Sequence, residues 1–152
     1  MIFPYTKMTC SPEQTEELGK ELASAMLADS FLPRFVALYG DLGVGKTAFV
    51  RGFTSAIAPT ARVKSPTFAL VNEYKGEKCS VFHFDMYRIE DEDDLYSIGF
   101  YDYFERNGIC LTEWSENIEY ALPEAYIRAN IRKCSEENTD MREVRLELCG
   151  AI

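Results

Sequence analysis

The segment from residue 40 to residue 47 reads Gly-Asp-Leu-Gly-Val-Gly-Lys-Thr. It is a complete G-x-x-x-x-G-K-[ST] phosphate-binding loop, which requires a buried strand before it and a helix after it. Gly40 and Gly45 allow a tight turn that brings backbone N–H groups close to phosphate oxygens. Lys46 supplies a positive charge to the β- and γ-phosphates, and the Thr47 hydroxyl is suited to bind Mg²⁺. The motif therefore indicates a nucleoside triphosphate site within an α/β fold.

The residues on both sides of the loop support this interpretation. Residues 34–39 form a short apolar run, typical of an interior parallel strand. After the loop, Phe49, Val50, Phe53 and Ile57 recur at helical spacing until Pro59 ends the pattern. The alternative, an ordinary glycine-rich turn, does not explain this strand–loop–helix context.

Length, charge and cysteine content limit the remaining possibilities. A chain of 152 residues is expected to form a single domain over 1–152. A net charge of −9 argues against unaided binding to nucleic acid but leaves room for a basic protein partner. The five cysteines lack Cys-x-x-Cys spacing, so we expect reduced thiols and no zinc site. With no signal peptide and no apolar run near about 18 residues, we expect a cytoplasmic protein that does not span a membrane.

The rest of the chain alternates between helical and strand patterns. Ser11-Pro12-Glu13-Gln14 predicts a helix start with a capping box, and the helix should run to about Leu27. The acidic run 90–94 precedes a second helical region, where it is better explained by the helix dipole than by a metal site. Strands are expected at 68–74, 79–87, 109–112, 127–131 and 144–148, with hairpin turns at 75–78 and around 138–140. The predicted fold is a three-layer P-loop NTPase-like α/β domain with a mixed central sheet and helices on both faces.

A phosphate-binding loop needs a carboxylate at the end of a nearby strand to hold Mg²⁺ and orient the attacking water. Asp85 and Glu113 both fit, and either could instead be an ordinary surface acid. Thr67 in the 65–68 segment could approach the γ-phosphate, although a plain proline turn explains it equally well. The absence of an Asn-Lys-x-Asp guanine motif favours ATP over GTP.

The single histidine and the single tryptophan lie close to these carboxylates in the sequence. His83 has no second ligand at metal spacing, so a hydrogen-bonded sheet histidine is favoured over a catalytic base. Trp114 directly follows Glu113 and could form an aromatic wall beside the triphosphate, a partner surface, or part of the core.

Four ordered motifs give the chain a strong resemblance to a known family. They are the loop at 40–47, Val-Lys-Ser-Pro-Thr-Phe at 63–68, His-Phe-Asp-Met-Tyr-Arg at 83–88 and Gly-Ile-Cys-Leu-Thr-Glu-Trp at 108–114. In this order they resemble TsaE (older name YjeE), the bacterial ATPase of threonylcarbamoyladenosine tRNA modification. The resemblance covers nearly the whole chain. One departure is Ser115, where the family usually has proline after Glu-Trp; its loss frees the backbone after Trp114.

The resemblance implies ATP and Mg²⁺ as cofactors and assigns roles to individual residues. Lys46, Asp85 and Glu113 would be catalytic, with Asp85 as the carboxylate needed for hydrolysis. Thr47, Asp85 and Glu113 would bind the metal. The nucleotide would contact Ser11 (or its neighbours), Gly40, Gly43, Val44, Gly45, Lys46, Thr47, Ala48, Trp114 and Arg142.

The resemblance also implies a protein partner, the TsaB–TsaD complex, through which tRNA would be contacted only indirectly. ATP hydrolysis by the isolated chain should then be slow. Two alternatives remain open. A small P-loop kinase would need an arginine-bearing lid, for which Arg88 and Arg106 are the nearby candidates. A nucleotide-sensing adaptor would bind ATP and do little chemistry.

Overall fold

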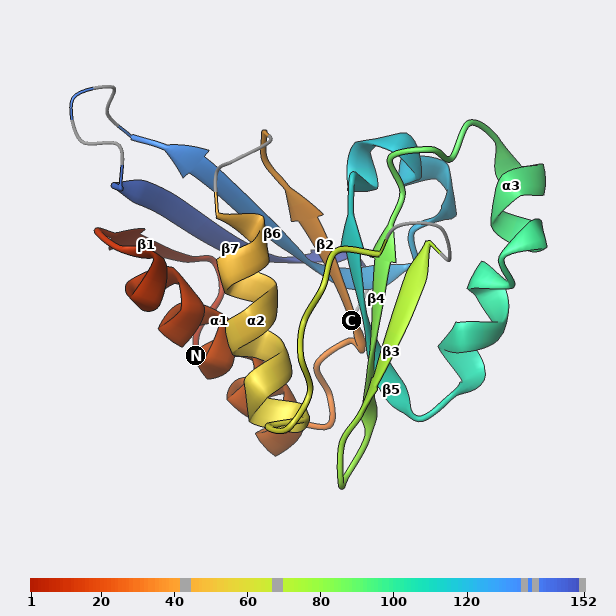
Figure 1. The fold of residues 1–152 in the computed structure, drawn as a ribbon, viewed down its shortest axis with the longest axis horizontal. Helices are drawn as coiled ribbons and strands as arrows, with labels where there is room; N and C mark the ends of the chain where they lie inside the picture. Colours follow the sequence, from red (N-terminus) through yellow and green to blue (C-terminus); the bar gives the residue numbers. More distant parts are fainter. Residues whose placement is uncertain (42–44, 67–69, 135–136, 138–139, 151–152) are drawn as a thin grey trace.

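A seven-stranded mixed sheet forms the centre of the molecule (Figure 1). The computed structural model describes residues 1–41, 45–66, 70–134, 137 and 140–150. The strands are β1 (Tyr5–Thr9), β2 (Phe35–Tyr39), β3 (Val71–Lys75), β4 (Ser80–Asp85), β5 (Gly108–Glu113), β6 (Ala125–Lys133) and β7 (Arg142–Gly150). They lie in the order β1-β7-β6-β2-β5-β4-β3, so β2 is central.

Strand direction divides the sheet into a parallel centre and antiparallel margins. β2 pairs in parallel with both β5 and β6, and β5 pairs in parallel with β4. The β3–β4, β6–β7 and β1–β7 pairs are antiparallel. Because β2, β4 and β5 run in the same direction, their carboxyl ends meet at one edge, where open α/β sheets bind ligands. The mixed sheet expected from the sequence is confirmed.

Helices cover both faces of this sheet (Figure 1). The longer pair, α1 and α2, lies on one face, and α3 with the short helix η1 lies on the other. The helices are α1 (Pro12–Ala28), α2 (Lys46–Ile57) and α3 (Glu92–Ser97), with 3₁₀ turns η1 (Phe100–Glu105), η2 (Ser115–Asn117) and η3 (Glu119–Ala121). Within the residues described, no helix is both long and apolar enough to cross a bilayer. The three-layer α/β architecture is therefore confirmed.

The start of α1 follows the predicted capping pattern with one difference. The Ser11 hydroxyl accepts a hydrogen bond from the Gln14 backbone N–H at 3.2 Å, as an N-cap should. The Gln14 side chain reaches back to the N–H of Cys10 at 2.7 Å, one residue earlier than a standard capping box. The two bonds satisfy one backbone donor within the first helical turn and one ahead of it.

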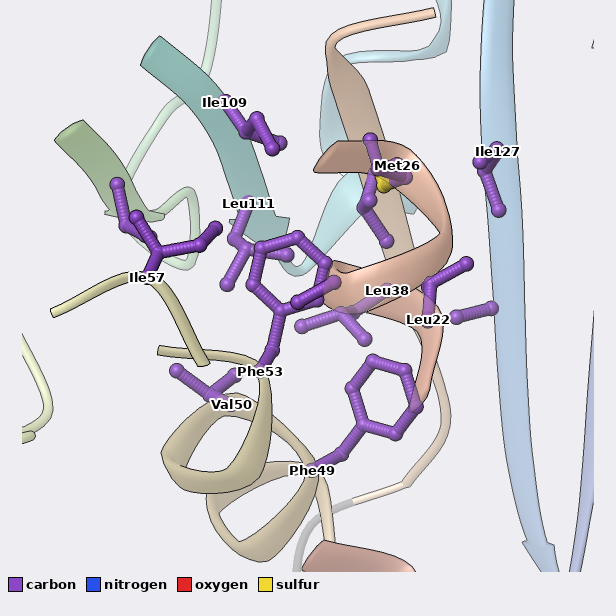
Figure 2. Packing of buried hydrophobic residues seen from close by; sticks show 14 of the residues in the cluster. Leu22, Met26, Leu38, Phe49, Val50, Phe53, Ile57, Ile109, Leu111 and Ile127 are labelled. Carbon is purple, nitrogen blue, oxygen red and sulfur yellow. The ribbon is translucent and has the colours of Figure 1, made fainter. Parts of the chain in front are cut away.

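The helices α1 and α2 approach each other closely because glycine occupies both sides of the contact. A Cβ atom at Gly52 would lie 1.7 Å from the Glu16 carbonyl oxygen, and one at Gly19 would lie 2.2 Å from that of Phe49. The helices then pack Leu22 and Phe53 onto the sheet, as Figure 2 shows. This close packing fixes where the amino end of α2 sits over the sheet.

The central strand β2 supplies a core on each face. All five of its side chains are buried. Val36 and Leu38 pack under α1 and α2, whereas Phe35, Ala37 and Tyr39 pack on the other face. The second core is rich in edge-to-face aromatic pairs, such as Phe84 with Phe100 at 5.2 Å between ring centroids.

One strand was not predicted from the sequence. β1 pairs antiparallel with β7 at the sheet margin, and its residues 6–8 are exposed. The expected strand at 68–74 begins at Val71, because Leu70 has a φ of 61° and lies outside the strand; residues 68 and 69 are not among those described. The hairpin turn at 75–78 is confirmed, with the Gly76 N–H bonded to the Cys79 carbonyl at 3.0 Å.

Candidate functional site

The described glycines of the motif, Gly40 and Gly45, have the positive φ that the sequence pattern predicts, and a helix follows directly. Gly40 and Gly45 both have positive φ, at 144° and 103°, in a region that favours glycine. Gly45 caps α2, and Lys46 is its first residue, so the free N–H groups of this helix end begin within the motif. Thr47 is exposed and Ala48 is buried. Gly43 and Val44 lie outside the described residues.

Asp85 and Glu113 occupy the same edge of the sheet, one strand apart. They are the last residues of β4 and β5, and they pair directly in the parallel register. Side chains two residues apart on a strand share a face. Glu113 therefore points to the same face as Leu111, which packs beneath α1 and α2. Both carboxyl groups lie on the side of the sheet that carries Lys46.

The electrostatic environment of Asp85 reflects this placement. Burial raises the pKa of its carboxyl group, and the negative charge of Glu113 raises it further. The Tyr87 backbone N–H, bonded to Asp85 Oδ1 at 3.0 Å, lowers the pKa, as do His83 and Lys46. Asp85, Glu113 and Lys46 therefore interact electrostatically, which is the combination expected around a bound cation or a reacting anion.

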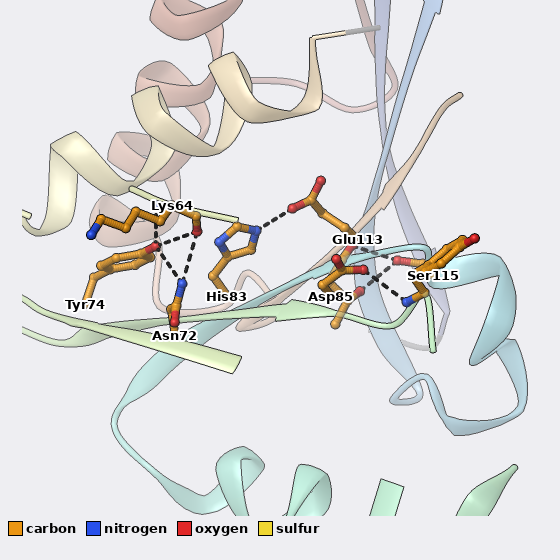
Figure 3. Close-up of polar contacts among 9 residues, drawn as sticks. Lys64, Asn72, Tyr74, His83, Asp85, Glu113 and Ser115 are labelled. Carbon is orange, nitrogen blue, oxygen red and sulfur yellow. Dashed lines mark hydrogen bonds and ion pairs between the residues drawn. The ribbon is translucent and has the colours of Figure 1, made fainter. Parts of the chain in front are cut away.

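Glu113 has a partner that the sequence analysis did not assign. Its Oε2 lies 2.5 Å from Nε2 of His83, and the His83 side chain is only 2 % exposed (Figure 3). The expectation of a hydrogen-bonded sheet histidine is confirmed. Residues two apart on a strand share a face, so the sequence alone could place His83 on the same face of β4 as Asp85.

Trp114 lies against the lysine of the loop. Its indole ring is 4.9 Å from Lys46 Nζ and 5.0 Å, between centroids, from the Tyr87 ring. The Trp114 backbone has a φ of 58°, uncommon for a residue other than glycine. Such backbone strain occurs at functional sites more often than elsewhere. Lys46 itself is buried, with 6 % exposure.

The turn after Trp114 is held by Ser115. Its side chain is fully buried and donates to the Thr112 carbonyl at 2.8 Å, with the Thr112 hydroxyl at 2.7 Å. Asn117 adds a bond from its side-chain amide to the Met86 carbonyl at 3.0 Å. Serine in place of proline therefore anchors this turn to β5 through side-chain hydrogen bonds instead of through a fixed φ.

Arg142 and the first turn of α1, which follows Ser11, lie beside the amino end of α2. A small hollow of about 40 Å³ lies beside Gly45 and Ala48. Its lining residues are Pro12, Thr15, Gly45, Ala48, Asp140 and Arg142. The Ser11 hydroxyl is engaged as the cap of α1, so its neighbours Pro12 and Thr15 face the hollow instead.

The other candidate residues lie in different surroundings. Arg106 precedes β5 at the end opposite Glu113 and binds both carboxylate oxygens of Glu73, at 2.8 and 2.9 Å. Arg88 is exposed just after β4. Asp91 caps α3 by accepting the Asp94 N–H at 3.0 Å, as the helix-dipole explanation expects. Thr67 lies outside the described residues.

Oxygen ligands for a hard cation are present, but they do not form a complete cage. Among the described residues, no three His, Cys, Asp or Glu side chains are grouped so as to hold a metal ion. Mg²⁺ in nucleotide sites is usually bound by one or two carboxylates together with substrate phosphates and water. Asp85, Glu113 and the Thr47 hydroxyl fit that shared mode of binding.

Comparisons with known proteins show which family the chain resembles. The family model "Threonylcarbamoyl adenosine biosynthesis protein TsaE" matches residues 9–144. The TsaE protein of Bacillus subtilis is 35% identical over 142 residues, which is 93% of this chain and 84% of that protein. The TsaE protein of Haemophilus influenzae is 48% identical over 96 residues, 63% of this chain and 61% of its own length.

A solved structure extends the likeness to the whole fold. The crystal structure of Bacillus subtilis YdiB matches with a TM-score of 0.73 and 29% identity, covering 99% of this chain and 88% of that one. The family is involved in tRNA threonylcarbamoyladenosine biosynthesis. The family model spans most of the chain, and the Bacillus subtilis relative is matched over most of its own length. The chain therefore belongs to the TsaE family.

Proposed function

We propose that this protein binds ATP with Mg²⁺ and hydrolyses it to support the TsaB–TsaD complex in threonylcarbamoyladenosine modification of tRNA. The observation that carries the proposal is the convergence of three charged groups. Lys46 begins α2, and Asp85 and Glu113 end adjacent parallel strands on the same face of the sheet. Electrostatic interaction of Asp85 with the other two supports their assignment to one site.

Each residue has a role that its position favours. The amino end of α2 and the ammonium group of Lys46 would hold the phosphates. Thr47, Glu113 and Asp85 would bind magnesium, which supplies charge neutralisation for the phosphate oxygens. Asp85 is the better proton acceptor for the attacking water, because burial raises its pKa while Glu113 is already bonded to His83.

Control by a partner would explain two contacts that the isolated chain makes at and near the site. The Lys46 ammonium group lies over the Trp114 ring, so this contact must change when phosphates enter. The Arg106 guanidinium is bonded to Glu73 and cannot serve as an arginine finger in this arrangement. We therefore expect slow hydrolysis by the isolated protein and faster turnover once a partner completes the site.

Phosphate release from ATP, measured with and without a TsaB–TsaD complex, tests the proposal. Lys46→Ala and Glu113→Ala should each lower turnover by about 100-fold or more, as expected when a group that stabilises transition-state charge is lost. Arg51→Ala is the matched control, since Arg51 is exposed on α2 and bonds Glu16 at 3.3 Å. Strong hydrolysis by the Glu113→Ala variant would reject the assignment of that residue.

Two other outcomes would replace the proposal altogether. A phosphorylated small-molecule product without release of free phosphate would identify a kinase. ATP that stays intact for hours in the presence of TsaB–TsaD would identify a nucleotide-sensing adaptor. Tryptophan emission offers a separate binding assay, because Trp114 is the only tryptophan and contacts Lys46.

A further inference from the structure

His83 is a polar residue buried among apolar neighbours in β4. Val81, Phe82 and Phe84, its neighbours in β4, are all fully buried hydrophobic residues. The His83 side chain is 2 % exposed. A buried imidazole in such a strand needs a hydrogen-bond partner to offset its loss of hydration.

That partner is Glu113, and the contact runs diagonally across two strands. The parallel register pairs His83 with Leu111 and Asp85 with Glu113, so the imidazole reaches two residues forward along β5, to the next side chain on the same face. Its Nε2 lies 2.5 Å from Glu113 Oε2 (Figure 3). A carboxylate only accepts hydrogen bonds, so Nε2 carries the proton and donates it to Glu113.

Both ring nitrogens are thereby withdrawn from direct chemistry. Nε2 is engaged by Glu113, and Nδ1 is buried without a hydrogen-bond partner among the residues described. A general base must present a nitrogen within reach of the water it activates. This geometry suits a fixed structural bond to the carboxylate better than proton abstraction.

We propose that His83 is a positioning residue that holds Glu113 in the orientation needed to bind the magnesium ion of the bound nucleotide. The inference rests on the proposed function. The imidazole engages one carboxylate oxygen, and the other points away from His83 (Figure 3). Metal-binding carboxylates are commonly oriented by such hydrogen bonds, and loss of the orienting partner typically weakens metal binding 10- to 100-fold.

Three substitutions at His83 separate the hydrogen bond from the packing of the side chain. His83→Leu keeps an apolar side chain but has no donor. His83→Gln can place an amide N–H near the position of Nε2, whereas the shorter side chain of His83→Asn cannot reach Glu113. Thr54→Val is the matched control, because Thr54 Oγ1 is also buried without a partner among the described residues.

Isothermal titration calorimetry would measure the binding of a non-hydrolysable ATP analogue at increasing magnesium concentration. The Leu and Asn variants should need 10- to 100-fold more magnesium for half-maximal enhancement of binding. Binding measured in EDTA should remain at the wild-type level, because His83 acts only through the metal ligand. The magnesium dependence of the Gln variant should approach that of the wild type, and the Thr54→Val variant should show the wild-type dependence.

The outcomes distinguish this role from a purely structural one. A Leu or Asn variant that is folded by circular dichroism and retains wild-type magnesium dependence overturns the proposal. Failure of both variants to fold also rejects it, because His83 would then serve the stability of the sheet. If the wild-type protein does not bind the analogue at all, the proposed function itself fails, and this role of His83 fails with it.

Discussion

Asp85 and Glu113 place two carboxyl groups side by side at the ends of adjacent strands. Partial burial raises the pKa of the Asp85 carboxyl group, and the negative charge of Glu113 raises it further. A carboxyl group whose pKa is raised in the folded state is destabilising when ionised, and lowering the pH through that pKa relieves the effect. The arrangement therefore suits a bound cation but costs stability in the ligand-free protein.

Asp85→Asn should abolish ATP hydrolysis and leave the ligand-free protein at least as stable as wild type. We expect a gain in unfolding free energy at pH 7 of up to about 1 kcal/mol, limited because the carboxyl group remains partly exposed to water. The amide oxygen can still accept the Tyr87 N–H. Urea unfolding checks this, with Glu90→Gln as an exposed control. A destabilised Asn variant would show that the ionised carboxylate supports the fold.

The thiols differ in reactivity because they differ in burial. Burial raises the pKa of Cys110 to about 12, whereas Cys10 is exposed. At pH 8 only about one Cys110 thiol in ten thousand is then ionised. Iodoacetamide should modify Cys10 in the native protein and Cys110 only after unfolding, as peptide mass mapping would show. Equal modification rates would mean that this face of the sheet opens readily.

At the level of helices and strands, strong local signals were enough to predict most of the fold. The phosphate-binding loop, the cap at Ser11 and the alternation in β6 and β7 each act within a few residues. β1 was missed because most of its side chains are exposed, and it is a strand through pairing with β7. Such pairing joins residues more than a hundred positions apart, so no local pattern reports it.

The contact between α1 and α2 depends on glycine at residue 52. Gly→Ala within a helix normally gains about 1 kcal/mol. Here the new Cβ would lie 1.7 Å from the Glu16 carbonyl, a backbone atom that cannot move without separating the helices. Gly52→Ala should therefore destabilise the protein by about 2 kcal/mol.

Thermal and urea unfolding measure this effect, with Arg51→Ala as the control on the neighbouring residue of the helix. That change removes only an exposed ion pair, worth about 0.5 kcal/mol. A Gly52→Ala variant more stable than wild type would show that the two helices can part without cost.

Across the whole molecule, two hydrophobic cores share one sheet. The side chains of β2 alternate between them, so loss of either core removes support from the same central strand. The convergence of Lys46, Asp85 and Glu113 could be predicted from sequence, because parallel strands end at a common edge. The His83–Glu113 bond could not, because it depends on the register between β4 and β5.

Phe53→Ala and Phe100→Ala remove fully buried rings from opposite faces of the sheet. Each should lower the unfolding free energy by about 3–5 kcal/mol. Because the sheet is shared, circular dichroism and Trp114 fluorescence should report one coincident transition in both variants. Phe31→Ala is the control, since Phe31 is 87 % exposed. Transitions that separate in either variant would show that the two faces unfold independently.

The indole ring beneath Lys46 also bears on which ligands the proposed nucleotide site would admit. An incoming molecule would have to draw the ammonium group off an aromatic face, and anionic oxygens offer that group a stronger attraction than neutral oxygens do. A free nucleoside offers no such exchange, however well its base might fit. Binding at this site would then depend first on the number of negative charges that a molecule carries, and only secondarily on its base.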